Sequence, residues 1–323
     1  MFTFENYLKK DLKELKYLFS ISFLLGFVVA FGQITYETVY VDYDSVWQYK
    51  NLRIIPIRPK AKPGQSSQSP GVLSLSQALK EGLATVTERG TASTENVHWL
   101  RINNRSDKSL FVSSGEVISG GRQDRMVARD TILSPSTHDQ YVPVMCVEEG
   151  RWSDKEKKFA YENFANPYLR KVLDESKNQV LIWNEIDSQL GQMDSKKNKT
   201  LAYLSHTLEK KTMLTGDEYF RYFQDKFRRT DSSIVGFVCV SGNRVIGCDI
   251  FAWNDLFYNQ LEPLLRGYID GAVLFGGPVS LTNNVVKEYM DNVLANEKGQ
   301  EDFVGKNGKL FRQGGNVIHI NTF

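Results

Sequence analysis

The sequence predicts an α+β protein in which an antiparallel, β-sandwich- or barrel-like N-terminal half packs with a mixed helix and β-hairpin C-terminal half. Three observations predict this fold class. Residues 83–147 contain short apolar runs separated by turn residues, as in antiparallel sheets. Residues 166–227 change to the apolar spacing of amphipathic helices. Residues 234–251 hold two β-branched runs around the turn sequence Ser-Gly-Asn, which predicts a hairpin.

The N-terminal segment has the features of an export signal, because residues 17–36 contain no charged residue and follow several lysines. Ala30 and Gly32 stand at the third and first positions before a signal-peptidase cut. We therefore predict a signal peptide over residues 1–32 and a secreted or periplasmic location. The apolar run is also long enough to stay uncleaved as an inner-membrane anchor, which would then be the only membrane contact. A buried N-terminal helix is the third interpretation.

Residues 33–323 form a single predicted domain, β-rich over 33–152 and mixed over 153–323. Extended residues 33–60 open it, followed by a Pro-, Gly- and Ser-rich surface loop. A short helix begins at Ser74, which has the capping-box spacing to Gln77. After the short strands, Ser153 to Glu156 repeat that spacing and predict the start of a helical region. The candidate helices of this region are 166–189, 197–211 and 215–227. After the hairpin we expect a helix over 254–275 and a final strand over 316–321.

The composition is that of an ordinary globular protein. The chain has 323 residues, 41% of them hydrophobic, and its 40 Lys and Arg balance 38 Asp and Glu to a net charge of +2. This near-neutral charge, with no basic tract, excludes nucleic acid as the main partner. The three cysteines are too few for a disulfide framework. We expect buried free thiols at all three, with a cross-link between Cys239 and Cys248 as the alternative if their register allows it.

The densest polar segment lies between two apolar runs, at residues 113–125. Glu116 is a candidate acid or base there, and the glycines at 120–121 permit a tight turn. The side chains suited to clamp a phosphate or carboxylate are Arg122, Gln123 and Arg125. The alternative is that Glu116 and Arg125 simply pair with each other across the turn. Neither a dinucleotide-binding glycine motif nor a phosphate-binding loop motif is present, and no motif names a cofactor.

A second polar group follows the apolar run at residues 142–147. Glu148 is a candidate general base, Arg151 offers an anion-binding fork, and Trp152 offers a face for stacking. The alternative is a solvated charge cluster at the end of a strand.

Metal chemistry has little support in the sequence. The four histidines are isolated, without the spacing of metal ligands, at positions His98, His138, His206 and His319. We predict no metal site, although a magnesium or calcium site built from carboxylates alone stays open. His319 is the most site-like of the four, because apolar residues flank it.

Several of these stretches resemble one family. They are residues 77–83, 86–88, 114–116, 120–125, 143–148, 150–152 and 317–320. In them the chain resembles the ARG and Rhodanese-Phosphatase-superfamily-associated Protein domain. The family is named for its association with ADP-ribosylglycohydrolase and rhodanese-phosphatase proteins, which implies a ligand derived from ADP-ribose or a nucleotide. The resemblance supports a site made of Glu116, Gln123, Arg125, Glu148, Arg151 and His319.

We therefore expect segments 115–125 and 146–152 to hold one small anionic ligand. The side chains expected to bind or stack on it are Arg122, Arg125, Arg151 and Trp152, and Glu116 or Glu148 would act as acid or base in a hydrolase. The competing interpretation is an exported interaction module without catalysis, which binds carbohydrate or protein at the cell surface.

Overall fold

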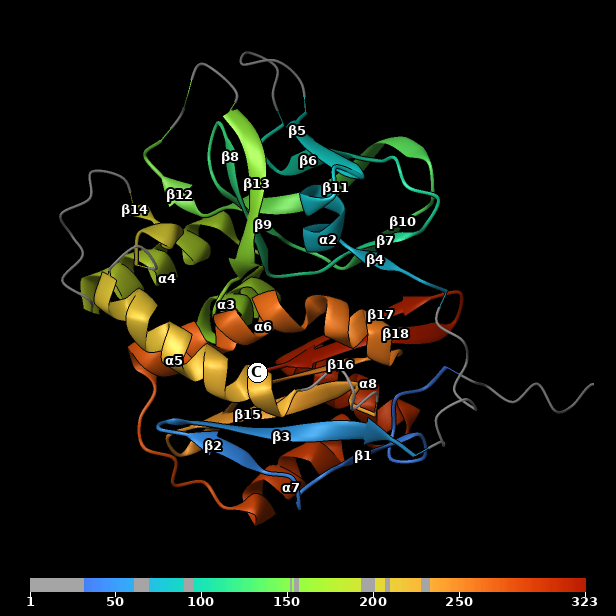
Figure 1. Cartoon of the computed structure of the whole chain (residues 1–323), viewed down its shortest axis with the longest axis vertical. Coiled ribbons are helices and arrows are strands. Elements are labelled where there is room, and N and C mark those ends of the chain that lie inside the picture. Colours follow the sequence, from blue (N-terminus) through green and yellow to red (C-terminus); the bar gives the residue numbers. More distant parts are fainter. Residues whose placement is uncertain are drawn as a thin grey trace, which may run out of the picture.

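The structure is a computed structural model that describes residues 32–60, 70–89, 96–151, 153, 157–192, 201–206, 210–227 and 233–323. This part of the chain is α+β, as predicted, and contains two main antiparallel sheets that lie one above the other in Figure 1. The predicted signal peptide before Gly32, and the predicted ligand contact Trp152, lie outside the described residues. No helix in the described ranges has the length and apolar character needed to cross a membrane.

The lower sheet has seven strands, in the order β1, β3, β15, β16, β18, β17, with β2 paired to β3. They are β1 (Val39–Val41), β2 (Trp47–Tyr49), β3 (Leu52–Pro59), β15 (Gly236–Ser241), β16 (Arg244–Phe251), β17 (Gly308–Gln313) and β18 (Asn316–Thr322). The predicted hairpin is confirmed as β15 and β16 and forms the centre of this sheet. The predicted β-rich segment 33–152 therefore contributes strands to both sheets.

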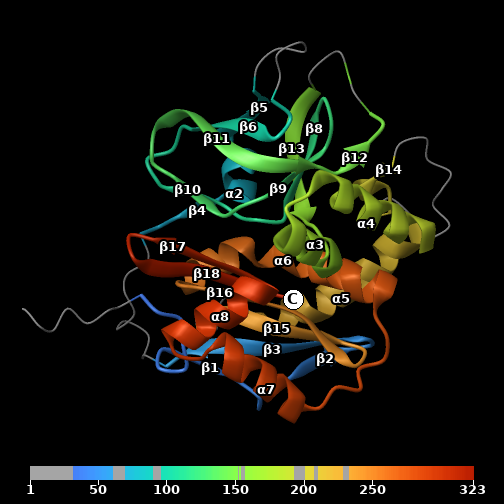
Figure 2. The ribbon, with the colours of Figure 1, turned by 180° about the vertical axis from the view of Figure 1, so that it is seen from behind.

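Helices cover both faces of the lower sheet (Figures 1 and 2). One face carries α5 (Lys210–Lys226) and α6 (Asn254–Phe275), and the other carries α7 (Asn283–Val293) and α8 (Glu297–Asn307). Two apolar cores result, and the central strands are buried on both sides, which explains their continuous apolar sequence. Cys239 belongs to one core and Cys248 to the other, so they point to opposite faces and cannot cross-link. All three cysteines are buried free thiols, as expected.

The upper sheet has six strands, in the order β13, β8, β9, β11, β6, β5. They are β5 (Ala84–Glu88), β6 (Trp99–Asn104), β8 (Glu116–Gly121), β9 (Arg125–Val127), β11 (Thr137–Cys146) and β13 (Lys157–Phe164). All neighbouring pairs are antiparallel. The sheet curls around an apolar core until its end strands, β5 and β13, approach each other, so that it is nearly a barrel.

Shorter elements surround the upper sheet and connect it to the lower one. These are β4 (Leu73–Ser74), α2 (Leu75–Lys80), β7 (Leu110–Val112), β10 (Thr131–Leu133), β12 (Glu148–Glu149), α3 (Pro167–Ser176), α4 (Gln179–Gln192), β14 (Leu201–Ala202) and a 3-10 turn, η1 (Tyr203–His206). Helix α2 confirms its predicted cap, since Ser74 Oγ accepts a hydrogen bond of 3.2 Å from the Gln77 N–H. Helices α3 and α6 lie between the two sheets (Figures 1 and 2).

The predicted helical start at residue 153 is wrong, because Lys157–Phe164 form the edge strand β13. Buried Phe159 between exposed Lys158 and Ala160 gives the two-residue alternation of a strand. The predicted helix over 166–189 is divided into α3 and α4 at Lys177, which has a left-handed φ of 48°.

Candidate functional site

Five predicted site residues meet where β8 turns into β9. Arg122, Gln123 and Arg125 come from this turn, and Glu148 and Arg151 come from the segment after β11. Gln123 Nε2 donates to the Glu148 carbonyl at 3.0 Å, and Arg151 Nε donates to the Glu148 carboxylate at 2.5 Å. Arg122 Nη1 donates to the Ser153 carbonyl at 2.6 Å. We call this group the arginine cluster.

Three carboxylates balance the three guanidinium groups of the arginine cluster. Asp124 accepts from Arg151 Nη2 at 3.0 Å, and Glu148 pairs with the same arginine. Glu88, at the end of β5, lies 3.6 Å from Nη2 of the fully buried Arg125. Glu88 ends one of the stretches that carry the family resemblance, but the sequence analysis did not name it as a site residue, since it lies in an alternating strand far from Arg125 along the chain. The Nε atom of Arg125 has no hydrogen-bond partner among the described residues.

Glu116 lies at the opposite end of β8, outside the arginine cluster. It is fully buried and accepts hydrogen bonds from the Ser113 N–H at 2.8 Å and from the Tyr161 hydroxyl at 3.2 Å. Burial raises the pKa of Glu116 to about 8, although the hydrogen bond from Ser113 acts in the opposite direction. Glu116 is therefore mostly protonated at neutral pH. It does not pair with Arg125, whose carboxylate neighbour is Glu88.

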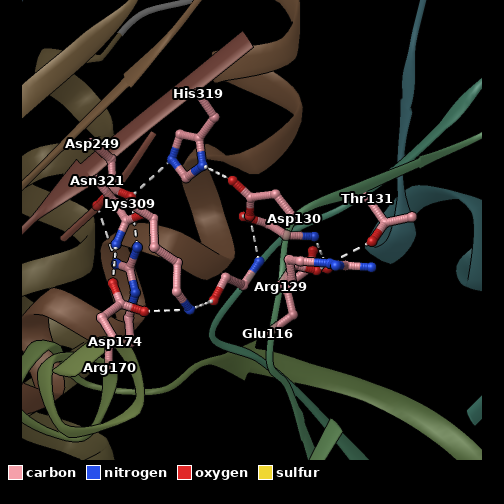
Figure 3. A network of polar contacts seen from close by, with 12 residues as sticks. Glu116, Arg129, Asp130, Thr131, Arg170, Asp174, Asp249, Lys309, His319 and Asn321 are labelled. Carbon is pink, nitrogen blue, oxygen red and sulfur yellow. Dashed lines mark hydrogen bonds and ion pairs between the residues drawn. The ribbon is translucent and has the colours of Figure 1, made fainter. Parts of the chain in front are cut away.

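His319 lies in a different group of buried charges, between the two sheets (Figure 3). Its Nδ1 is 2.7 Å from Asp130 of the upper half, and its Nε2 is 3.1 Å from Asp249 on β16. Arg170 of α3 holds Asp249 with two hydrogen bonds of 2.6 and 3.1 Å. The imidazole ring also stacks on Phe251, with centroids 4.3 Å apart. We call this group, together with Lys309 and Asp174, the inter-sheet network.

The inter-sheet network is charged, and all of its side chains except Lys309 are almost completely buried. Burial alone would lower the pKa of His319, but the charge of Asp130 and the hydrogen bonds to both carboxylates raise it to about 9. Burial would likewise raise the pKa of Asp249, but the Arg170 guanidinium holds it well below its usual range. An imidazolium thus lies between two carboxylates, with His319 and Asp249 fully buried.

Lys309 on β17 adds a second link between the halves (Figure 3). Its ammonium group donates to Ser114 Oγ at 2.8 Å and to the Ala128 carbonyl at 2.9 Å, and it pairs with Asp174 of α3. The sequence signal that could have found this network is Asp249, a single carboxylate inside an otherwise apolar strand.

A groove of about 1060 Å³ opens elsewhere, between β5 and β13 of the upper sheet. Helix α2 and the first half of α6 also line it, and Phe159 and Tyr161 form part of its wall. The charged side chains along it are Lys80, Arg105, Lys158, Glu162 and Glu262. We call it the β5–β13 groove.

The charges of the β5–β13 groove are paired unevenly. Glu162 accepts a hydrogen bond from Ser119, and Glu262 lies 3.4 Å from Arg266. In contrast, within the described ranges no side-chain hydrogen bond or ion pair is made by Lys80, Arg105 or Lys158. The Ser119 hydroxyl is neutral and leaves the charge of Glu162 in place, so the groove carries these three cations against two carboxylates, one of which faces Arg266. Its side chains therefore have an excess of positive charge.

Two side chains of the groove wall contact residues of the predicted polar segment 113–125, one of which is the predicted site residue Glu116. Tyr161 lines the groove and donates its hydroxyl hydrogen to Glu116 behind it. Phe159 lines the groove and packs over Gly121, where an added Cβ would be 2.1 Å from its ring and 2.5 Å from Glu88 Oε1. The structure describes no group of three His, Cys, Asp or Glu side chains suited to a metal ion.

The fold thus defines an α+β protein in which a barrel-like sheet is fastened to a helix-covered antiparallel sheet by buried charges. Residues 40–320 match the model of the ARG and Rhodanese-Phosphatase-superfamily-associated Protein domain, and the chain belongs to this family. A search of curated proteins and a search of solved structures find no match.

Proposed function

We propose that the protein binds an anionic ligand in the β5–β13 groove. The observation that carries this proposal is the uneven pairing: the groove carboxylates have partners, whereas Lys80, Arg105 and Lys158 have none among the described residues. Exposed cations that no carboxylate neutralises attract an anion at little desolvation cost. The groove volume of about 1060 Å³ is also at the upper end of the roughly 300–1,000 Å³ typical of ligand sites.

The arginine cluster supports this function less well. Arg125 lies near Glu88, and Arg151 pairs with both Asp124 and Glu148, so an anion entering the cluster would meet three carboxylates at close range. The cluster is better suited to hold the β8–β9 turn against the segment after β11.

The family resemblance supplies the first ligands to test, which are ADP-ribose and nucleotides. A hydrolase activity would draw its acid from Glu116, since this buried carboxyl contacts Tyr161 and Tyr161 borders the groove. A binding module without catalysis needs only the groove and its cations. Export of the domain stays a prediction from the N-terminal sequence.

Thermal-shift titration tests the proposal. ADP-ribose, AMP and pyrophosphate are added to the wild type and to a triple variant, Lys80→Glu, Arg105→Glu and Lys158→Glu. We expect at least one of these anions to raise the wild-type midpoint and to have no effect on the variant. The matched control reverses three exposed lysines on α7 and α8, with the same change in net charge, at Lys287, Lys298 and Lys306.

Three results would contradict the proposal. The first is that no anion, including the acidic peptide introduced below, binds to the wild type. The second is that Arg151→Gln removes binding while the groove variant retains it, because the ligand would then lie in the arginine cluster. Loss of binding in the control variant would show that only net charge matters, which also contradicts a specific site.

A further inference from the structure

The β5–β13 groove is bordered by the two end strands of the upper sheet. In the described part of the chain, β5 pairs only with β6 and β13 pairs only with β8, so each has one edge without a strand partner. Such edges present backbone N–H and C=O groups that can pair with another strand. Because every neighbouring pair in the sheet is antiparallel, the end strands of this six-stranded order run in opposite directions.

We infer that the anionic ligand of this groove is an extended peptide with acidic side chains, which binds by adding a strand to the sheet. This inference rests on the proposed function, because it names the class of ligand for the same groove. Some Cα atoms of β5 and β13 lie within 8 Å of each other, which is closer than the roughly 9.5 Å that a strand paired to both would need. The peptide would therefore pair with the free edge of β5 alone. The five residues of β5 correspond to about 16 Å of extended chain, which sets the bound length at about five residues.

Small side chains leave the strand edges accessible. This holds for β5, whose lining residues Ala84, Thr85, Val86 and Thr87 are all too short to cover the backbone, whereas on β13 Ala160 lies among longer side chains. Phe159 and Tyr161 supply an apolar wall for alternate peptide side chains. A peptide with alternating apolar and acidic residues matches this arrangement, because successive side chains of a strand point to opposite sides.

The cations are spread along the groove rather than gathered at one point. Lys158 is on β13, Lys80 ends α2, and Arg105 lies beside the start of β5, where its N–H donates to the Leu83 carbonyl. Carboxylates at successive positions of an extended chain could each meet one of these cations. A single phosphate group would meet fewer of them.

Fluorescence anisotropy tests this inference on the full chain. The probe is a fluorescein-labelled peptide with the sequence Val-Glu repeated three times, and the charge control is Val-Lys repeated three times. We expect saturable binding of the acidic peptide only, weakened at least tenfold by the triple groove variant and unchanged by the control variant of Lys287, Lys298 and Lys306.

Backbone methylation separates strand addition from simple charge attraction. Two further acidic peptides carry N-methyl groups on alternate backbone nitrogens, one in each phase, which keeps the charges and removes half of the N–H donors. We expect at least one phase to bind tenfold more weakly. Equal binding of all three acidic peptides would overturn strand addition while leaving the proposed anion site intact.

The small-anion titration separates the two proposals further. If ADP-ribose or pyrophosphate binds in the groove and the acidic peptide does not, the peptide inference fails and the proposed function stands. If neither the small anions nor the peptide bind, both fail.

Discussion

Lys309 and Lys158 are lysines on strands that border charged regions, but their surroundings differ. Lys309 is mostly buried and contacts Ser114, Asp174 and the Ala128 carbonyl, which joins the two sheets. Lys158 is exposed at the groove and has no side-chain partner among the described residues. Charge alone therefore does not indicate a ligand site in this protein. The unpaired cations of the groove are free to bind a ligand, whereas the paired charges of the inter-sheet network hold the structure together.

Replacement of Arg170 has the largest expected effect. Arg170→Met leaves the fully buried Asp249 without its guanidinium partner, and breaking a buried ion pair in this way costs about 3–5 kcal/mol. Chemical denaturation of both proteins measures the difference in the free energy of unfolding.

The adjacent residue of α3 provides the control. Lys171 is half exposed and lies 3.8 Å from Glu175, so Lys171→Met should change stability by less than about 1 kcal/mol. If Arg170→Met costs no more than Lys171→Met, the network does not hold the two sheets together.

The next effect is a pH dependence that comes from His319. Its pKa is raised to about 9 in the folded protein, against about 6.5 for an unperturbed histidine. Its contribution to stability is therefore fully present below about pH 6.5 and is lost as the pH rises through about 9. The difference in pKa corresponds to roughly 3 kcal/mol.

Denaturation of the wild type and His319→Asn between pH 6 and pH 10 isolates this contribution. The contribution of Glu116 to the free energy of unfolding also falls as the pH rises towards 8. Glu116 is present in both proteins, so this contribution cancels in the difference. We expect the difference in unfolding free energy to shrink with rising pH. His98→Asn is the control, because it makes the same change of side chain at an exposed position outside the network. A constant difference for His319→Asn would mean that the imidazole is neutral in the folded protein.

The fold could be predicted from the sequence where the signals are local. The hairpin, the helix at 254–275 and the cap at Ser74 are confirmed, because each depends on residues a few positions apart. The pairing of β3 with β15 could not be predicted, since no local pattern states which of several apolar strands will be neighbours. The helix predicted from residue 153 is wrong, because the prediction gave the capping-box spacing more weight than the alternating pattern of the strand that follows.

The candidate site shows the same limit. The fold brings together Arg122, Gln123 and Arg125 with Glu148 and Arg151, because β9 begins beside the end of its neighbour β11. The partners of Arg125 and His319, which are Glu88, Asp130 and Asp249, are distant in sequence and depend on how the sheets fold. No sequence motif predicts the groove, because it is formed by strand edges and by cations that lie far apart in the sequence.

The smallest expected effect is that of a groove lysine on stability. Lys158→Met removes a charge without a partner and should change the free energy of unfolding by no more than about 0.5 kcal/mol. Lys309→Met, measured in the same assay, leaves the buried carboxylate of Asp174 with its hydrogen bond from Asn321 but without its cation, and should destabilise the protein clearly. If both variants clearly destabilise the protein by a similar amount, Lys158 supports the fold and is not free to bind a ligand. If both are neutral, the buried pair contributes nothing, and the contrast between the two regions lies only in their access to solvent.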